Sequence, residues 1–148
     1  MIIAIDFDGT IVSQDGPYDA AAPEFLPGAK DALLALQRAG HRLLLWSARA
    51  NLANRENWRR NPLWTEEPPG WENDRELNEQ RYQVMCRFVA SELPGVFAAV
   101  DDGRQGKPVG VDLFIDDKAI GLGPLGLEWK QIAYRLGEPE HVGTRPGR

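Results

Sequence analysis

The first five residues of the chain are all apolar, and this run stops abruptly at the acidic segment Asp6-Phe7-Asp8. An apolar run without alternation predicts a strand buried on both faces, as in a parallel sheet. Further short apolar runs predict strands at residues 43–46, 96–100 and 111–115. Apolar residues at helical spacing predict helices at residues 29–39, 74–93 and 128–136. This alternation predicts a doubly wound (Rossmann-like) open α/β sheet, mainly parallel, with helices on both faces.

The length of the chain predicts one domain. It has 148 residues, of which 43% are hydrophobic and 26% are charged, as in ordinary globular proteins. We expect a single core domain over residues 1–136, interrupted at about residues 58–73 by an irregular insertion rich in Trp and Pro. Residues 137–148 are rich in Pro, Gly and charge, so we expect a mobile tail.

Charge and cysteine usage exclude several classes of function. The net charge of −5 disfavours a protein that binds nucleic acid stably or lies on an anionic membrane. One cysteine, Cys86, cannot form an internal disulfide, and two histidines do not make a zinc site. No apolar stretch is long enough to span a membrane, and the N-terminus lacks the layout of a signal peptide. We therefore expect a cytoplasmic protein with no membrane partner.

Polar side chains follow three of the predicted strands, namely Asp6 and Asp8, Ser47, and Asp116 and Asp117. In an open α/β sheet, ligands bind at the carboxyl ends of the strands. Four carboxylates in one crevice repel each other unless a cation lies among them or some are protonated, and oxygen ligands favour Mg²⁺. A carboxylate beside Mg²⁺ can attack phosphorus and carry an aspartyl-phosphate. Lys107, before the last predicted strand, could neutralise charge on a phosphoryl group.

These residues resemble the four motifs of the haloacid dehalogenase-like hydrolase superfamily. Residues 6–11 are similar to its first motif, DxDGT followed by an apolar residue, and residues 43–47 to its second, an apolar strand that ends in Ser or Thr. Lys107 fits the third motif, and residues 114–117 resemble the fourth. The motifs occur in family order over residues 6–117. The short intervals between them imply a member with no cap domain or a minimal one.

The resemblance implies a role for each residue. Asp6 would be the nucleophile, and Asp8 the general acid and base that protonates the leaving group and then activates water. The expected phosphate-binding residues are Ser47, Lys107, Gly9, Thr10 and Ala48. The expected Mg²⁺ ligands are Asp6, Asp116 and the backbone carbonyl of Asp8, with Asp117 behind them or bound through water. The implied function is a Mg²⁺-dependent phosphohydrolase that cleaves a phosphomonoester through an aspartyl-phosphate on Asp6.

Several assignments have alternatives. Lys118 and Lys130 compete with Lys107 for the role of the third-motif lysine, and Ser47 is also a candidate helix N-cap. Arg49 resembles an arginine of polynucleotide kinase-phosphatases, which makes it a candidate substrate ligand, although a surface position would explain it equally well. In and beside the insertion lie the aromatic and basic residues Trp58, Trp64, Trp71, Arg59 and Arg60. They fit a substrate lid or, as we prefer, a packing cluster.

Two alternative functions also remain. One is a nucleotide or polynucleotide-end phosphatase, so the phosphorylated substrate is either a small molecule or a nucleic-acid end. The other is a non-catalytic module that binds Mg²⁺ and accepts a phosphoryl group, or that binds a partner. Receiver domains also combine carboxylates, Mg²⁺, Ser or Thr and Lys at strand ends. Their acceptor Asp follows a middle strand, where this chain has Ser47.

Overall fold

The structure, a computed structural model, describes residues 1–13, 23–50, 75–102, 108, 110–118 and 129–137. Four short strands form one parallel sheet in the order β3-β2-β1-β4. They are β1 (Ile2–Ile5), β2 (Arg42–Leu45), β3 (Phe97–Val100) and β4 (Leu113–Ile115). The helices are α1 (Ala29–Arg38), the short 3₁₀ helix η1 (Ala48–Ala50), α3 (Arg75–Glu92) and α4 (Trp129–Gly137).

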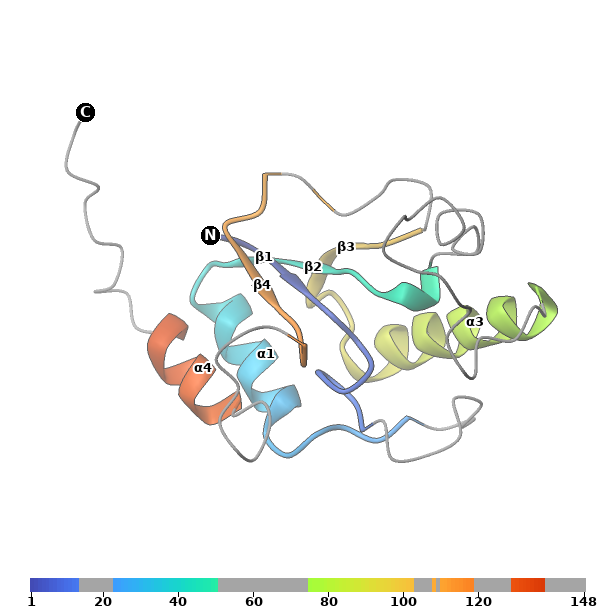
Figure 1. Cartoon of the computed structure of the whole chain (residues 1–148). Helices are drawn as coiled ribbons and strands as arrows, with labels where there is room; N and C mark the ends of the chain where they lie inside the picture. Colours follow the sequence, from blue (N-terminus) through green and yellow to red (C-terminus); the bar gives the residue numbers. More distant parts are fainter. Residues whose placement is uncertain (14–22, 51–74, 103–107, 109, 119–128, 138–148) are drawn as a thin grey trace.

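The order of the strands explains how the ends of the chain meet. From β1 the chain passes through α1 to β2 and through α3 to β3, which adds strands on one side of β1. β4 then pairs with the other side of β1, so residues 2–5 and 113–115 lie side by side (Figure 1). The expected open α/β sheet of Rossmann-like type is confirmed. Within the described residues, α1, α3 and α4 lie on the same side of the sheet (Figure 1), so helices on the opposite face stay a prediction.

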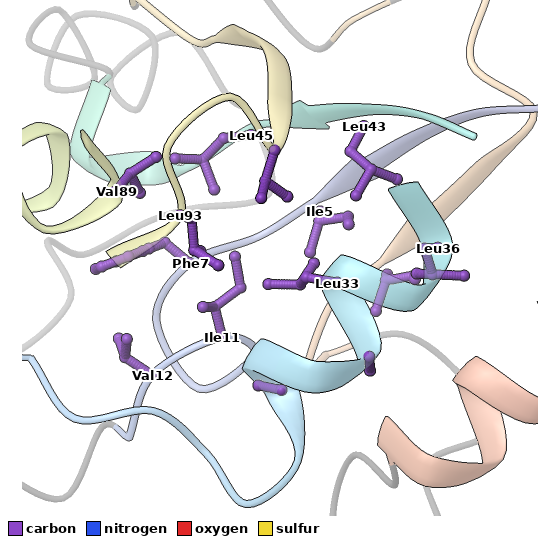
Figure 2. Close-up of a cluster of buried hydrophobic side chains, with 14 of the residues drawn as sticks. Ile5, Phe7, Ile11, Val12, Leu33, Leu36, Leu43, Leu45, Val89 and Leu93 are labelled. Atoms are coloured by element: carbon purple, nitrogen blue, oxygen red, sulfur yellow. The ribbon is translucent and has the colours of Figure 1, made fainter. Parts of the chain in front are cut away.

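The hydrophobic core lies between the sheet and these helices. Ile3 and Ile5 of β1 are fully buried, as are Leu33 and Leu36 of α1. Figure 2 shows side chains from β1, β2, α1 and α3 meeting in this layer. The core residues include Ile3, Ile5, Phe7, Ile11, Leu33, Leu36, Leu43, Leu45, Met85, Val89, Leu93, Ile115 and Trp129. Because Phe7 and Ile11 belong to this core, the loop that carries the acidic motif is anchored in it.

The helices begin and end within two residues of their predicted bounds. α1 starts after Gly28, whose φ of 79° lies in the left-handed region, where glycine is favoured. α4 packs on α1, and the Cα of Gly28 faces Trp129 and Lys130. The insertion predicted at residues 58–73 and the tail after residue 137 lie outside the described residues. No helix in the described part of the chain is both long and apolar enough to span a bilayer.

Candidate functional site

The carboxyl ends of β1, β2 and β4 lie level with one another. Ile5 is paired with Leu45 on one side and with Ile115 on the other. The backbone N–H of Asp6 donates to the carbonyl of Ile115 at 3.0 Å, and the N–H of Trp46 donates to that of Ile5 at 2.9 Å. The segments that follow the three strands, which start at Asp6, Trp46 and Asp116, therefore leave the sheet at one edge.

A compact turn holds the acidic segment after β1. The carbonyl of Phe7 accepts backbone N–H groups from Thr10, Ile11 and Val12 at 3.4, 2.9 and 3.1 Å. Gly9 has a φ of 72°, a left-handed conformation that a side chain would strain. Phe7, which lies between Asp6 and Asp8, is fully buried, so its side chain fixes the turn to the core.

Three carboxylates come together at this edge. Asp6, Asp116 and Asp117 each offer an oxygen within 4.8 Å of those of the other two. One oxygen of Asp116 accepts the backbone N–H of Lys118 at 2.8 Å. The Oδ1 atom of Asp117 is buried and has no hydrogen-bond partner among the described residues. Such a buried oxygen is a position that a bound cation or a water molecule would satisfy.

The pKa values of the cluster also favour a bound cation. The pKa of Asp6 is raised to about 7, chiefly by burial and further by the charges of Asp116, Asp8 and Asp117, while the backbone N–H of Phe7 opposes the rise. Burial and a hydrogen bond with Asp116 also raise the pKa of Asp117. Without a cation, the folded protein therefore disfavours three ionised carboxylates at once.

These residues fit a hard divalent cation. The donors are all carboxylate oxygens, which Mg²⁺ and Ca²⁺ prefer over nitrogen or sulfur ligands. A cation would supply the missing partner of Asp117 and offset the repulsion around Asp6. Nothing in the donor set distinguishes Mg²⁺ from Ca²⁺, so the choice of Mg²⁺ stays a prediction, as does the role of the Asp8 carbonyl as a ligand.

Thr10 joins the two acidic loops. Its side-chain oxygen accepts the backbone N–H of Asp117 at 2.9 Å across 107 positions of sequence. Its carbonyl accepts the indole N–H of Trp129 at 2.7 Å. Thr10 is fully buried and Trp129 is 1% exposed, so both contacts are shielded from water. Thr10 thus fixes the loop after β4 against the loop after β1, and α4 supports both.

Asp8 does not belong to the described acidic cluster. Its two carboxylate oxygens accept hydrogen bonds from Nε and Nη2 of Arg49, both at 2.7 Å. Only 8% of the Arg49 side chain and 12% of the Asp8 side chain are exposed. Arg49, which the sequence suggested as a substrate ligand, is therefore engaged with the predicted acid and base instead.

Ser47 lies at the start of η1 and is almost fully buried. Its Oγ accepts the backbone N–H of Arg49 at 3.3 Å, which matches the capping interpretation of this residue. Ala48 is the first residue of η1. The N–H of Gly9 donates to the carbonyl of Val12 at 2.8 Å, and that of Thr10 to Phe7 at 3.4 Å, so both donors have partners within the turn. The phosphate-binding roles of these residues stay predictions.

Which lysine fills the third motif stays a prediction. Lys107 lies outside the described residues, as do the aromatic and basic residues of the insertion. Lys118 is exposed directly after Asp117, and Lys130 is exposed on α4.

A second acidic pair follows β3 and has a different environment. The N–H of Asp101 donates to the carbonyl of Leu45 at 2.8 Å, and its carbonyl accepts the hydroxyl of Tyr82 at 3.1 Å. Burial raises the pKa of Tyr82 to about 12, with contributions from Cys86 and from both aspartates, Asp101 and Asp102. Among the described residues, the metal cluster does not include this pair.

The sequence did not reveal two members of the site. Trp129 was predicted only as part of a helix, and no pattern signals an indole that donates to a loop 119 positions away. The pairing of Arg49 with Asp8 was missed as well, although the DxD motif and an arginine soon after the second motif are visible in the sequence. Their combination is the signal that could have suggested it.

Comparisons with known proteins add little to this geometry. No protein family model and no curated protein matches the chain. A solved structure of a conserved protein from Bacteroides thetaiotaomicron is similar at 28% identity, over 92% of this chain and 88% of that chain, with a TM-score of 0.49.

Proposed function

We propose that this chain is a metal-dependent phosphohydrolase of the haloacid dehalogenase-like type, which cleaves a phosphomonoester through an aspartyl-phosphate on Asp6. The observation that carries the proposal is the approach of Asp6 to Asp116 and Asp117 within 4.8 Å, with Asp8 two residues further on. Such a reaction requires strand ends that lie level, a carboxylate cluster that can hold a cation, and a separate carboxylate outside that cluster.

In the first step, a carboxylate oxygen of Asp6 attacks phosphorus. The bond between phosphorus and the ester oxygen breaks, and that oxygen takes its proton from Asp8 and leaves as an alcohol. Proton donation matters here because an alkoxide is a poor leaving group without it. The first step leaves Asp6 phosphorylated and Asp8 as a carboxylate.

In the second step, water gives a proton to Asp8 and its oxygen attacks phosphorus. The bond between phosphorus and Asp6 breaks, so phosphate leaves, Asp6 is again a carboxylate and Asp8 is again protonated. A bound divalent cation would favour the ionised form of Asp6 and offset charge on the phosphoryl oxygens. Asp6, Asp116 and Asp117 would hold it, and we propose Mg²⁺.

Ser47 supports phosphate binding in this proposal. It lies two residues after the end of β2, which pairs with β1, the strand that precedes Asp6, and it is buried at the start of η1. The contact with Arg49 uses a lone pair of its hydroxyl oxygen, so the hydroxyl proton can still be donated to a phosphoryl oxygen.

The test is hydrolysis of an aryl phosphate with and without Mg²⁺, comparing the wild type with Asp6→Asn, Asp8→Asn and a matched control. Asp112→Asn is suitable as the control because Asp112 lies at the opposite end of β4 from Asp116 and is exposed. We expect Mg²⁺-dependent turnover in the wild type and the control. Asp6→Asn should lose it by at least about 10³-fold, since no nucleophile remains.

Two results would contradict the proposal. Turnover that survives Asp6→Asn would show that Asp6 is not the nucleophile. A stable phosphorylated protein that releases no phosphate would instead favour the phospho-acceptor module. If turnover is found, a panel of sugar phosphates, nucleotides and oligonucleotides with a terminal phosphate would identify the substrate class.

A further inference from the structure

Asp8 and Arg49 form a paired contact with both charged groups shielded from solvent. Two N–H groups of one guanidinium meet two oxygens of one carboxylate, each at 2.7 Å. This parallel geometry fixes the plane of the carboxylate as well as its distance. The low exposure of the pair, at 8% and 12%, separates it from ordinary surface ion pairs, which contribute little.

Arg49 is itself held from two further sides. Its Nη1 donates to the backbone carbonyl of Arg81 on α3 at 3.1 Å. Its guanidinium carbon lies 5.1 Å from the centre of the Phe7 ring, which is within the range of a cation–π contact. Because Phe7 belongs to the core and Arg81 to a long helix, the guanidinium has a rigid support. The orientation of Asp8 is therefore set in part by η1 and α3, which lie outside its own loop.

These contacts leave few N–H groups of Arg49 for a substrate. Nε, Nη1 and Nη2 each already donate to a protein oxygen. A phosphate group that bound the guanidinium through the same donors would have to displace Asp8 or the carbonyl of Arg81. The contacts favour a residue that acts on Asp8 over one that binds the phosphoryl group directly.

We infer that Arg49 is the positioning residue for Asp8, which it holds in the orientation needed to pass a proton to and from the reacting oxygen. The inference rests on the proposed function, in which Asp8 is the acid and base. In the acid form of Asp8, the oxygen that carries the proton has released its guanidinium contact and faces the leaving oxygen, while the other oxygen still accepts from Arg49. The proton moves from Asp8 to the leaving oxygen as the bond to phosphorus breaks.

The dependence on the leaving group tests this role. A p-nitrophenolate leaves readily without a proton, whereas an alkoxide needs one. The kcat/KM value covers only the steps up to formation of the phosphoenzyme, so it isolates the first step from the later hydrolysis. We expect Arg49→Gln to lower kcat/KM for an alkyl phosphate at least about tenfold, and that for p-nitrophenyl phosphate less than about threefold.

Two further variants make the test decisive. Arg49→Lys keeps the charge but cannot form the paired contact, so the same selective loss is expected, to a smaller extent. It also serves if circular dichroism shows that Arg49→Gln does not fold. Arg87→Gln is the matched control, because Arg87 is an exposed arginine on α3 and should leave both kcat/KM values unchanged.

The remaining outcomes separate this inference from the proposed function. Equal losses on both esters, with a raised KM, would mean that Arg49 binds phosphate directly and would overturn the inference. No loss on either ester would overturn it as well, and both results would leave the phosphatase intact. A wild type without Mg²⁺-dependent turnover on either ester would overturn the proposed function and this inference with it.

Discussion

Asp6 is buried beside two other carboxylates, and this environment gives it an unusual proton affinity. Its pKa rises from an ordinary 3.8 to about 7, chiefly through burial and then through the charges of Asp116, Asp8 and Asp117. The folded chain therefore binds a proton at Asp6 at pH values where the unfolded chain has released it. A raised carboxyl pKa links protonation to folding, and the sign of that link can be measured.

We expect the contribution of Asp6 to stability to fall as the pH rises from about 4 to about 7 in the absence of divalent cations. Below the ordinary pKa, both states are protonated and the contribution is fully present. Above the raised pKa, both are ionised and it is lost. The loss should reach a few kcal/mol, because a tenfold difference in proton affinity corresponds to about 1.4 kcal/mol.

Urea unfolding of the wild type and of Asp6→Asn at several pH values, with a metal chelator present, measures this effect. Other carboxylates titrate in the same range, so the informative quantity is the difference between the two proteins. The variant should gain stability relative to the wild type as the pH rises, since it carries no charge at this position. A difference that does not vary with pH would mean that Asp6 titrates in its ordinary range.

Some contacts of the site could be predicted because the residues follow strand ends. Others depend on where a long side chain reaches and could not. Asp6 and Asp116 could be expected to meet because each directly follows a predicted parallel strand. Asp8 and Arg49 are 41 positions apart, and an arginine side chain is long enough to reach in many directions. Its partner depends on the positions of Phe7 and Arg81, which only the packed structure provides.

Elements were predictable to within two residues, and their contacts were not. The helix at residues 29–38 follows from apolar spacing and from the glycines at positions 28 and 40, and β1 follows from an unbroken apolar run. The spacing of apolar residues also predicted α4, but it did not show that its first residue supports the acidic loop. Periodicity identifies which face of a helix is buried and not what that face touches.

At the scale of this element, Trp129→Phe should destabilise the protein by about 2–3 kcal/mol. The change removes the donor to the carbonyl of Thr10, leaves that buried oxygen without a partner, and shrinks a side chain that is only 1% exposed. Chemical denaturation measures the loss of stability.

Tyr134→Phe is the matched control, since Tyr134 lies on the same helix and is 69% exposed. The free energy of unfolding of this variant should stay within about 0.5 kcal/mol of the wild type. Equal stability of Trp129→Phe and the wild type would mean that α4 does not support the loop.

The acidic cluster depends on the connectivity of the whole molecule. Its carboxylates come from residue 6 and from residues 116 and 117, which are brought together only when β4 pairs with β1. The sequence predicted four strands and the edge where their chemistry gathers. The order of the strands was not fixed by any local pattern, because an apolar run does not specify on which side of β1 it pairs.

A cation that binds this cluster binds the folded chain alone, so Mg²⁺ should raise the melting temperature. At a Mg²⁺ concentration ten times the dissociation constant, the gain in stability is about 1.4 kcal/mol, or about 3–6 °C for a chain of this size.

Asp116→Asn should differ from the wild type both without metal and with it. Without metal at pH 8 it should melt above the wild type, because one repulsive charge is gone, and with Mg²⁺ it should gain little. Asp112→Asn changes the net charge equally at the other end of β4 and should respond to Mg²⁺ as the wild type does. An equal response to Mg²⁺ from all three proteins would show that the ion binds elsewhere.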